Sequence, residues 1–178
     1  MIELDIDAKG IESIVRDLAA TEQQATKALN TTLNKMAAWV RSKSAKGLSS
    51  SLAIQQKIIR RRLKSLRLTR RGNSSQIVVW YGLDPIALIY LQAKQTKAGV
   101  KAFGGRTVKS AFIAEGQNGN QQVFKRRGRK RLPIDKQVEN ISDRAQEYIE
   151  DHVFDSAEFE ARFFKIFEHE LQWQTRTQ

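Results

Sequence analysis

Cysteine is absent from this sequence of 178 residues, which excludes disulfide bonds and thiolate metal ligands. Long apolar runs are absent as well, and none approaches the about 20 residues that a membrane-spanning helix requires. The first residues, Met-Ile-Glu-Leu-Asp-Ile-Asp, lack the basic and apolar regions of a secretory signal. We therefore expect a soluble protein that is made in the cytoplasm and has no membrane partner.

The groups that usually carry catalysis are also scarce. The two histidines, His152 and His169, lie on an acidic segment without any metal-ligand spacing. A serine–lysine pair is formally possible in Ser42-Lys43-Ser44, but this lysine lies among other basic residues on a polar segment. Between residues 23 and 134 the only acids are Asp84 and Glu115, too few for a two-metal nuclease. The sequence predicts no enzyme, no metal site and no cofactor.

What the sequence has in excess is positive charge, and it is unevenly spread. Residues 1–134 carry 26 basic and eight acidic residues, whereas the chain from Asp135 onward carries eleven acidic and five basic residues. Residues 41–72 contain eleven bases and no acid, and a second basic run follows at 126–131. A solvated basic face and an anionic partner both remain open. The candidate contacts to DNA or to an acidic partner are Arg60, Arg61, Arg62, Lys64, Arg126, Arg127, Arg129, Lys130 and Arg131.

The N-terminal third is predicted to be mostly helical. Alternating apolar residues predict a short strand over 2–6, and helical spacing with several alanines then predicts one long helix over about 10–46. Such a helix is longer than a compact domain of this size needs, so we expect part of it to contact another subunit. Gly47 to Ser51 is predicted to break it, and a second helix follows with Ile54, Ile58 and Leu63 facing inward.

The middle of the chain is predicted to be a small antiparallel sheet. Residues 76–81 have the β-branched and aromatic composition of a strand, and Asp84-Pro85 follows its end. Further strand-like pieces cover 99–108, 110–114 and 122–125, and the Asn-Gly pair between the last two predicts a hairpin turn. Residues 86–91 fit a helical turn or an irregular connection.

The C-terminal segment is predicted to be helical, with Asp155 and Glu158 as a capping pair. Apolar residues at mostly four-residue steps form a stripe with more aromatic surface than its polar surroundings can cover. Burial in the core is one interpretation and a subunit interface is the other. The candidate interface residues are Phe159, Phe163, Phe167, Leu171 and Trp173.

Together these elements predict an α+β fold, in which a long N-terminal helix and C-terminal helices pack on a small, mainly antiparallel sheet. We place the α+β core at residues 1–135 and an acidic, aromatic-rich helical extension at residues 136–178.

The middle of the chain has a distinctive order of residues, from Ala111-Phe112-Ile113-Ala114 through Val123-Phe124-Lys125-Arg126 to Lys130-Arg131-Leu132-Pro133-Ile134. This block resembles the phage minor tail protein Z family and is the most specific part of the resemblance. Gly99-Val100-Lys101-Ala102, the stretch from Ser49 to Leu63 and the alanine-rich helix before it are also similar to that family. The resemblance runs over about residues 10–140, and the C-terminal helix departs from it.

The resemblance implies a structural virion protein: a tail completion, terminator or head–tail joining component at the head-proximal end of a phage tail. It implies a homo-oligomeric ring, with a hexamer favoured, and other tail or neck proteins as partners. The basic residues of the chain add DNA in the tail lumen as an expected partner. The alternative is a non-sequence-specific DNA-binding accessory protein that uses residues 41–72 and 125–131, since no helix-turn-helix, RRM or zinc-finger signature is present. A small hydrolase or nuclease is the least favoured alternative.

Overall fold

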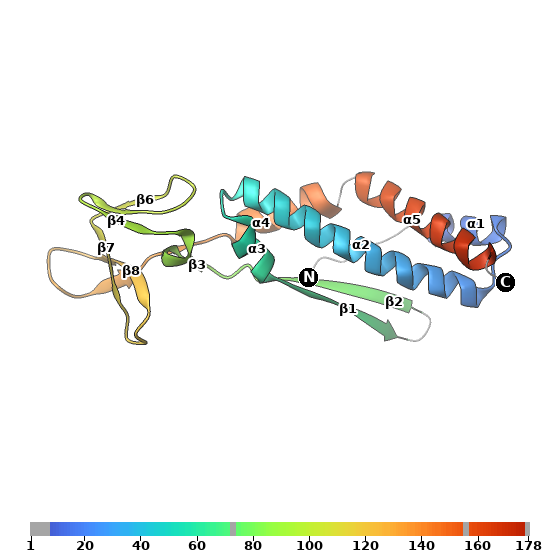
Figure 1. The fold of residues 1–178 in the computed structure, drawn as a ribbon, viewed down its shortest axis with the longest axis horizontal. Helices are drawn as coiled ribbons and strands as arrows, with labels where there is room; N and C mark the ends of the chain where they lie inside the picture. The colour runs from blue at the N-terminus through green and yellow to red at the C-terminus, as the bar shows by residue number, and fades with distance from the viewer. Residues whose placement is uncertain (1–7, 72–73, 155–156, 177–178) are drawn as a thin grey trace. The chain divides into compact units, whose positions relative to one another are not determined.

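The computed structural model describes residues 8–71, 74–154 and 157–176. At residues 8, 64–71 and 74–80 it describes the backbone and not the side chains. The chain forms two compact units (Figure 1). Unit 1 is drawn from Met1–Ser44, Leu63–Tyr81 and Tyr148–Gln178, and unit 2 from Ala45–Arg62 and Gly82–Glu147. The helices are α1 (Ala8–Asp17), α2 (Glu22–Ser51), α3 (Gln56–Arg62), α4 (Ser142–Ile149) and α5 (Ala157–Arg176), with a 3₁₀ turn η1 (Leu88–Leu91) and a π-helical segment η2 (Glu150–Phe154).

The single long helix predicted over 10–46 is two helices. α1 ends where Ala19 adopts a left-handed conformation (φ 46°), and the amide of Ala20 donates to the carbonyl of Val15 at 3.1 Å. α2 then begins behind a capping box, in which the Thr21 amide donates to Gln24 Oε1 (2.9 Å) and the Gln24 amide donates to Thr21 Oγ1 (3.3 Å). The prediction was wrong here because apolar spacing continues across a break that local hydrogen bonds create.

The predicted break at Gly47–Ser51 is also wrong, since α2 continues through Gly47 and ends at Ser51. Leu48 and Leu52 are each 1% exposed, and their burial outweighs the roughly 1 kcal/mol that a glycine costs inside a helix. The helix ends with left-handed Ala53 (φ 47°), beyond which the Ile54 amide donates to the Ser49 carbonyl at 3.1 Å. Two helix ends in this chain thus place alanine where glycine is usual.

Unit 1 contains a β-hairpin formed by β1 (Leu63–Arg71) and β2 (Ser74–Tyr81). β2 confirms the strand predicted over 76–81, whereas β1 was expected to be the end of a helix. Pairing with β2 gives β1 its backbone partners, and this tertiary pairing overrides the weak strand propensity of its basic residues. At the end of β2 the Tyr81 hydroxyl lies 2.8 Å from Ser44 Oγ of α2. Burial raises the pKa of Tyr81 to about 12, and the hydrogen bond with Ser44 lowers it slightly.

The core of unit 1 is the contact between α2 and α5, with α1, η2 and the end of α4 packed around it (Figure 1). Phe163 and Phe167 of α5 are 1% and 0% exposed, and their rings stack with centroids 6.1 Å apart. On α2 they meet a stripe of small and medium apolar side chains: Ala28, Met36 and Val40. Lys35 of α2 and Glu170 of α5 form an ion pair at 2.6 Å beside this core.

Unit 2 contains three small antiparallel sheets. In the first sheet, β3 (Ile86–Ala87) pairs with β10 (Val138–Glu139). The second sheet contains, in this order, β4 (Lys94–Thr96), β5 (Gly99–Lys101) and β6 (Thr107–Lys109). The third contains, in this order, β7 (Ala111–Glu115), β8 (Gln121–Arg126) and β9 (Ile134–Lys136). The predicted turn between β7 and β8 is confirmed, with the Gly116 amide bonded to the Asn120 carbonyl and Gly119 at φ 71°. The undecided residues 86–91 are β3 followed by the turn η1.

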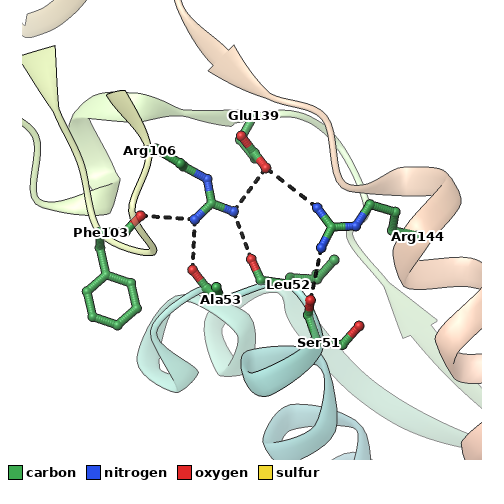
Figure 2. A network of polar contacts seen from close by, with 7 residues as sticks. All are labelled: Ser51, Leu52, Ala53, Phe103, Arg106, Glu139 and Arg144. Atoms are coloured by element: carbon green, nitrogen blue, oxygen red, sulfur yellow. Dashed lines mark hydrogen bonds and ion pairs between the residues drawn. The ribbon is translucent and has the colours of Figure 1, made fainter. Parts of the chain in front are cut away.

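A polar network holds the β5–β6 hairpin of unit 2 to the C-terminal end of α2 (Figure 2). The Arg106 guanidinium donates to the backbone carbonyls of Leu52 (2.7 Å), Ala53 (2.8 Å) and Phe103 (2.9 Å). It also donates to Glu139 Oε1 at 2.9 Å. The last carbonyls of a helix have no intrahelical partner and carry partial negative charge, so a cation is well placed there.

The α+β class predicted from the sequence is confirmed. In space, the C-terminal helix α5 packs with α1 and α2 in unit 1. The predicted division of the chain at residue 135 stays a prediction. The strand predicted over 2–6 and the cap at Asp155 lie outside the described residues. Within those residues, no helix is both long enough and apolar enough to cross a membrane.

Candidate nucleic-acid interface

The second basic run forms the connection between β8 and β9 in unit 2, where it is exposed. Its base is closed by the Arg127 amide, which donates to the Pro133 carbonyl at 3.2 Å. The Arg127 guanidinium makes two hydrogen bonds of 2.8 Å to the carboxylate of Asp135. That guanidinium holds the pKa of the Asp135 carboxyl below its usual value, chiefly through the hydrogen bond. The charge of Arg127 is therefore already balanced within the chain.

Arg126 is partly used for the local structure as well. Its guanidinium lies over the ring of Phe112, 5.2 Å from the centroid, and donates to the backbone carbonyl of Arg131. Phe112 in turn faces Phe124 across the β7–β8 pair, with centroids 6.1 Å apart. Phe124 is close to the basic run in sequence, and the strand register places Phe112 beside it.

The three remaining basic side chains of this connection have no ion-pair partner among the described residues. Arg129, Lys130 and Arg131 are exposed, and no carboxylate of the described residues forms an ion pair with any of them. We call these three residues the loop tip. It is the part of this connection that is free to meet a phosphate or an acidic surface.

The first basic run is divided between the two units. Arg60 and Arg61 lie exposed on α3, whereas Arg62 donates to the carbonyls of Gly82, Asp84 and Pro85 and fixes the chain after β2. Lys64 lies in β1 opposite Trp80, and its side chain is outside the described part. Among the described residues, no hydrogen bond or ion pair joins α3 to the β8–β9 connection.

Four of the five candidate interface residues on α5 are buried in the chain's own core. Phe159, Phe163, Phe167 and Leu171 are 7%, 1%, 0% and 0% exposed. Of the two interpretations of this stripe, core and subunit interface, burial against α1 and α2 accounts for these four without a second subunit. Trp173 is 57% exposed, and its contact with another subunit stays a prediction.

The histidines and carboxylates do not gather into a metal-binding group in the part of the chain that the structure describes. His152 stacks on Tyr148, with ring centroids 4.6 Å apart, and His169 Nδ1 lies 3.4 Å from Glu170 Oε1. Lys35 lowers the pKa of Glu170, mainly through its hydrogen bond. These groups serve local packing and ion pairing on helices.

Comparison with known proteins gives one family. No curated protein and no solved structure matches the chain. The family model described as prophage minor tail protein Z matches residues 8–178, which is essentially the whole chain. The match includes the C-terminal helix α5, where the sequence resemblance stopped. The chain belongs to the prophage minor tail protein Z family, a family of phage tail proteins.

Proposed function

We propose that this protein completes the phage tail at its head-proximal end, as a tail terminator or head–tail joining component. The observation that carries the proposal is the family match over residues 8–178. Several copies form a closed ring, with a hexamer favoured, and the ring contacts other tail or neck proteins. The proposed role is structural and without a catalytic step, in keeping with a structural tail family.

Deletion of the gene from a phage or inducible prophage tests this role. Head–tail joining should fail, so electron microscopy should show DNA-filled heads and separate tails, and infectious yield should fall. Expression of the wild-type protein from a plasmid should restore joined particles. Normal joined particles from the deletion strain would overturn the proposal.

The ring is tested by the mass of the purified protein in solution, measured by light scattering. The wild-type protein is compared with a variant at Trp173. A mass of several subunits is expected, and Trp173→Asp should lower it, because an exposed aromatic ring at a subunit contact would be replaced by a charge. Phe164→Leu, an apolar exchange at a partly buried position on the same helix, is the control. A monomeric wild-type protein at every concentration would contradict a ring of this chain alone.

A second candidate function is non-sequence-specific DNA binding, and the free loop tip favours it. Replacement of Arg129, Lys130 and Arg131 by glutamine should weaken DNA binding equally for all sequences. The slope of log affinity against log salt should fall by about one for each phosphate that the variant no longer neutralises. Unchanged binding would exclude the loop tip as a DNA-binding element.

A further inference from the structure

The sheet β4–β5–β6 of unit 2 has two chemically different faces. Its register places Lys94 directly opposite Lys101. Paired residues share a face, and every second residue of a strand returns to it. One face therefore consists of Lys94, Thr96, Gly99, Lys101, Thr107 and Lys109. All three lysines are exposed, and we call this surface the lysine face.

The opposite face attaches the sheet to the rest of unit 2. Val100 on this face is 1% exposed. The Gln95 side chain donates to the Ala111 carbonyl (3.2 Å) and accepts from the Ile113 amide (2.9 Å), so it ties β4 to β7. The sheet is held by its inner face, which leaves the lysine face turned outward.

The strands that carry the lysines are fixed closely together. A Cβ atom on Gly99 would come 2.2 Å from the Val108 carbonyl oxygen, so only glycine permits this approach of β5 and β6. The turn between the two strands is held by Arg106, which donates to the carbonyls at the end of α2 (Figure 2). Lys101 and Lys109 therefore cannot move apart by separation of β5 and β6.

The pairing of Lys94 with Lys101 lowers the stability of the sheet when no anion is bound. Like charges directly opposite each other on paired strands are destabilising. None of Lys94, Lys101 and Lys109 forms an ion pair with a carboxylate among the described residues. The sequence ranges of unit 2 carry 18 basic and six acidic residues, so the surroundings of the face add to its positive potential.

We propose that the lysine face binds the phosphate backbone of double-stranded DNA. Protein interfaces are depleted in lysine and have apolar centres, whereas this face has no apolar side chain. DNA interfaces are strongly positive, and threonine hydroxyls such as that of Thr107 commonly donate to phosphate oxygens. The absence of an aromatic residue on this face favours the backbone over the bases. Tail joining itself needs no DNA contact, so this inference goes beyond the first proposed function. It shares its ligand with the second candidate function but assigns that ligand to a different surface from the loop tip.

The test measures binding of the full-length protein to a short fluorescent DNA duplex between about 50 and 200 mM salt. The triple variant Lys94→Gln, Lys101→Gln, Lys109→Gln should bind about tenfold more weakly or worse. The slope of log affinity against log salt should fall by about one per lysine. The same weakening for duplexes of unrelated sequence is expected, because phosphate contacts carry no sequence information.

The control removes the same charge from unit 1 with Arg16→Gln, Lys27→Gln, Lys165→Gln, at three exposed positions. It should leave the slope nearly unchanged. The single variant Lys101→Gln should raise the melting temperature by about 1–3 °C while it weakens binding, since it relieves the repulsion with Lys94. If Lys101 were important only for folding, the same substitution would lower the melting temperature.

Three results would overturn the inference: equal weakening in the two triple variants, a lower melting temperature for Lys101→Gln, or wild-type protein that binds polyglutamate and not DNA. The last result would assign the lysine face to an acidic protein partner. None of these outcomes alters head–tail joining in the deletion experiment, so the two proposals fail separately.

Discussion

Unit 1 and unit 2 differ in what holds them together and in the charge that they carry. Unit 1 is built on an aromatic core between α2 and α5, and its sequence ranges carry 13 basic and 13 acidic residues. Unit 2 combines small sheets and short helical segments around buried aliphatic side chains such as Ile54, Leu91 and Val123, and polar contacts of Arg106 add to this core. Its sequence ranges carry 18 basic and six acidic residues. The whole net charge of +12 thus belongs to unit 2.

This difference changes the meaning of the charge asymmetry along the chain. In sequence, a basic N-terminal part precedes an acidic C-terminal part. In the structure, the acidic α5 packs against α2, where Lys35 pairs with Glu170 and Lys43 pairs with Glu158, both at 2.6 Å. The acids thus balance the charge of the unit with the aromatic core, and unit 2 keeps its excess of basic residues.

The aromatic core of unit 1 gives the largest expected effect. Phe163→Ala should lower the free energy of unfolding by about 3–5 kcal/mol, since a buried phenylalanine is replaced by a cavity. Denaturant unfolding measures the change, and hydrogen exchange should assign it to unit 1. Trp173→Ala, at an exposed position on the same helix, should cost less than about 1 kcal/mol. A Phe163→Ala protein that stays stable but loses its oligomeric state would restore the interface interpretation.

The polar network of unit 2 gives the next largest effect. Arg106→Gln should cost about 2–4 kcal/mol, because it removes one partner of a largely buried ion pair and leaves helix-end carbonyls unsatisfied. Hydrogen exchange should rise in residues 99–109. Arg144→Gln is the comparison variant, since that guanidinium is exposed, lies 4.0 Å from Glu139 and makes one hydrogen bond, to the Ser51 carbonyl at 2.9 Å. Equal effects of the two variants would contradict the assigned role of Arg106.

The Tyr81–Ser44 contact should make the stability of unit 1 depend on alkaline pH. The folded-state pKa of Tyr81 is about 12 against an ordinary value of 10.0, so the folded state retains the proton more strongly. The protonated hydroxyl of Tyr81 therefore contributes roughly 2–3 kcal/mol to the free energy of unfolding below pH 10. This contribution is lost as the pH rises from 10 to about 12. Tyr81→Phe should flatten this part of the curve of unfolding free energy against pH. An unchanged alkaline slope would contradict the burial of the hydroxyl.

The smallest effect is expected at the Arg127–Asp135 pair of unit 2. Asp135→Asn removes a negative charge and releases the guanidinium, so DNA affinity should rise while stability changes little. The salt slope should become steeper by up to about one. Glu158→Gln, which removes an exposed paired acid from unit 1, should leave DNA binding as it is. A fall in affinity for Asp135→Asn would mean that the pair positions the loop tip rather than masking Arg127.

The sequence predicted the elements that local chemistry determines. The strand at 76–81, the hairpin around Asn118-Gly119 and the apolar stripe of α5 were all found from residue type and spacing. The capping box of Thr21 and Gln24 was missed, although a threonine followed three residues later by glutamine is a helix-start signature.

Other features depend on contacts distant in sequence and had no local signal. Gly47 stays helical because Leu48 and Leu52 are buried, and β1 is a strand because β2 pairs with it. Arg106 reaches the end of α2, 53 residues away, and no spacing rule indicates that contact. Of the predicted site, the basic loop tip is exposed, but the lysine face was missed because only the strand register brings its three lysines together.

Photocrosslinking inside assembled particles tests the central claim, that the charged unit meets DNA and the neutral unit does not. A photoreactive amino acid at position 101, in the lysine face, should crosslink to DNA in filled particles. The same group at position 165, exposed on α5 of unit 1, should crosslink to protein. Crosslinks from position 101 to protein alone, or DNA crosslinks of equal yield from both positions, would contradict the account.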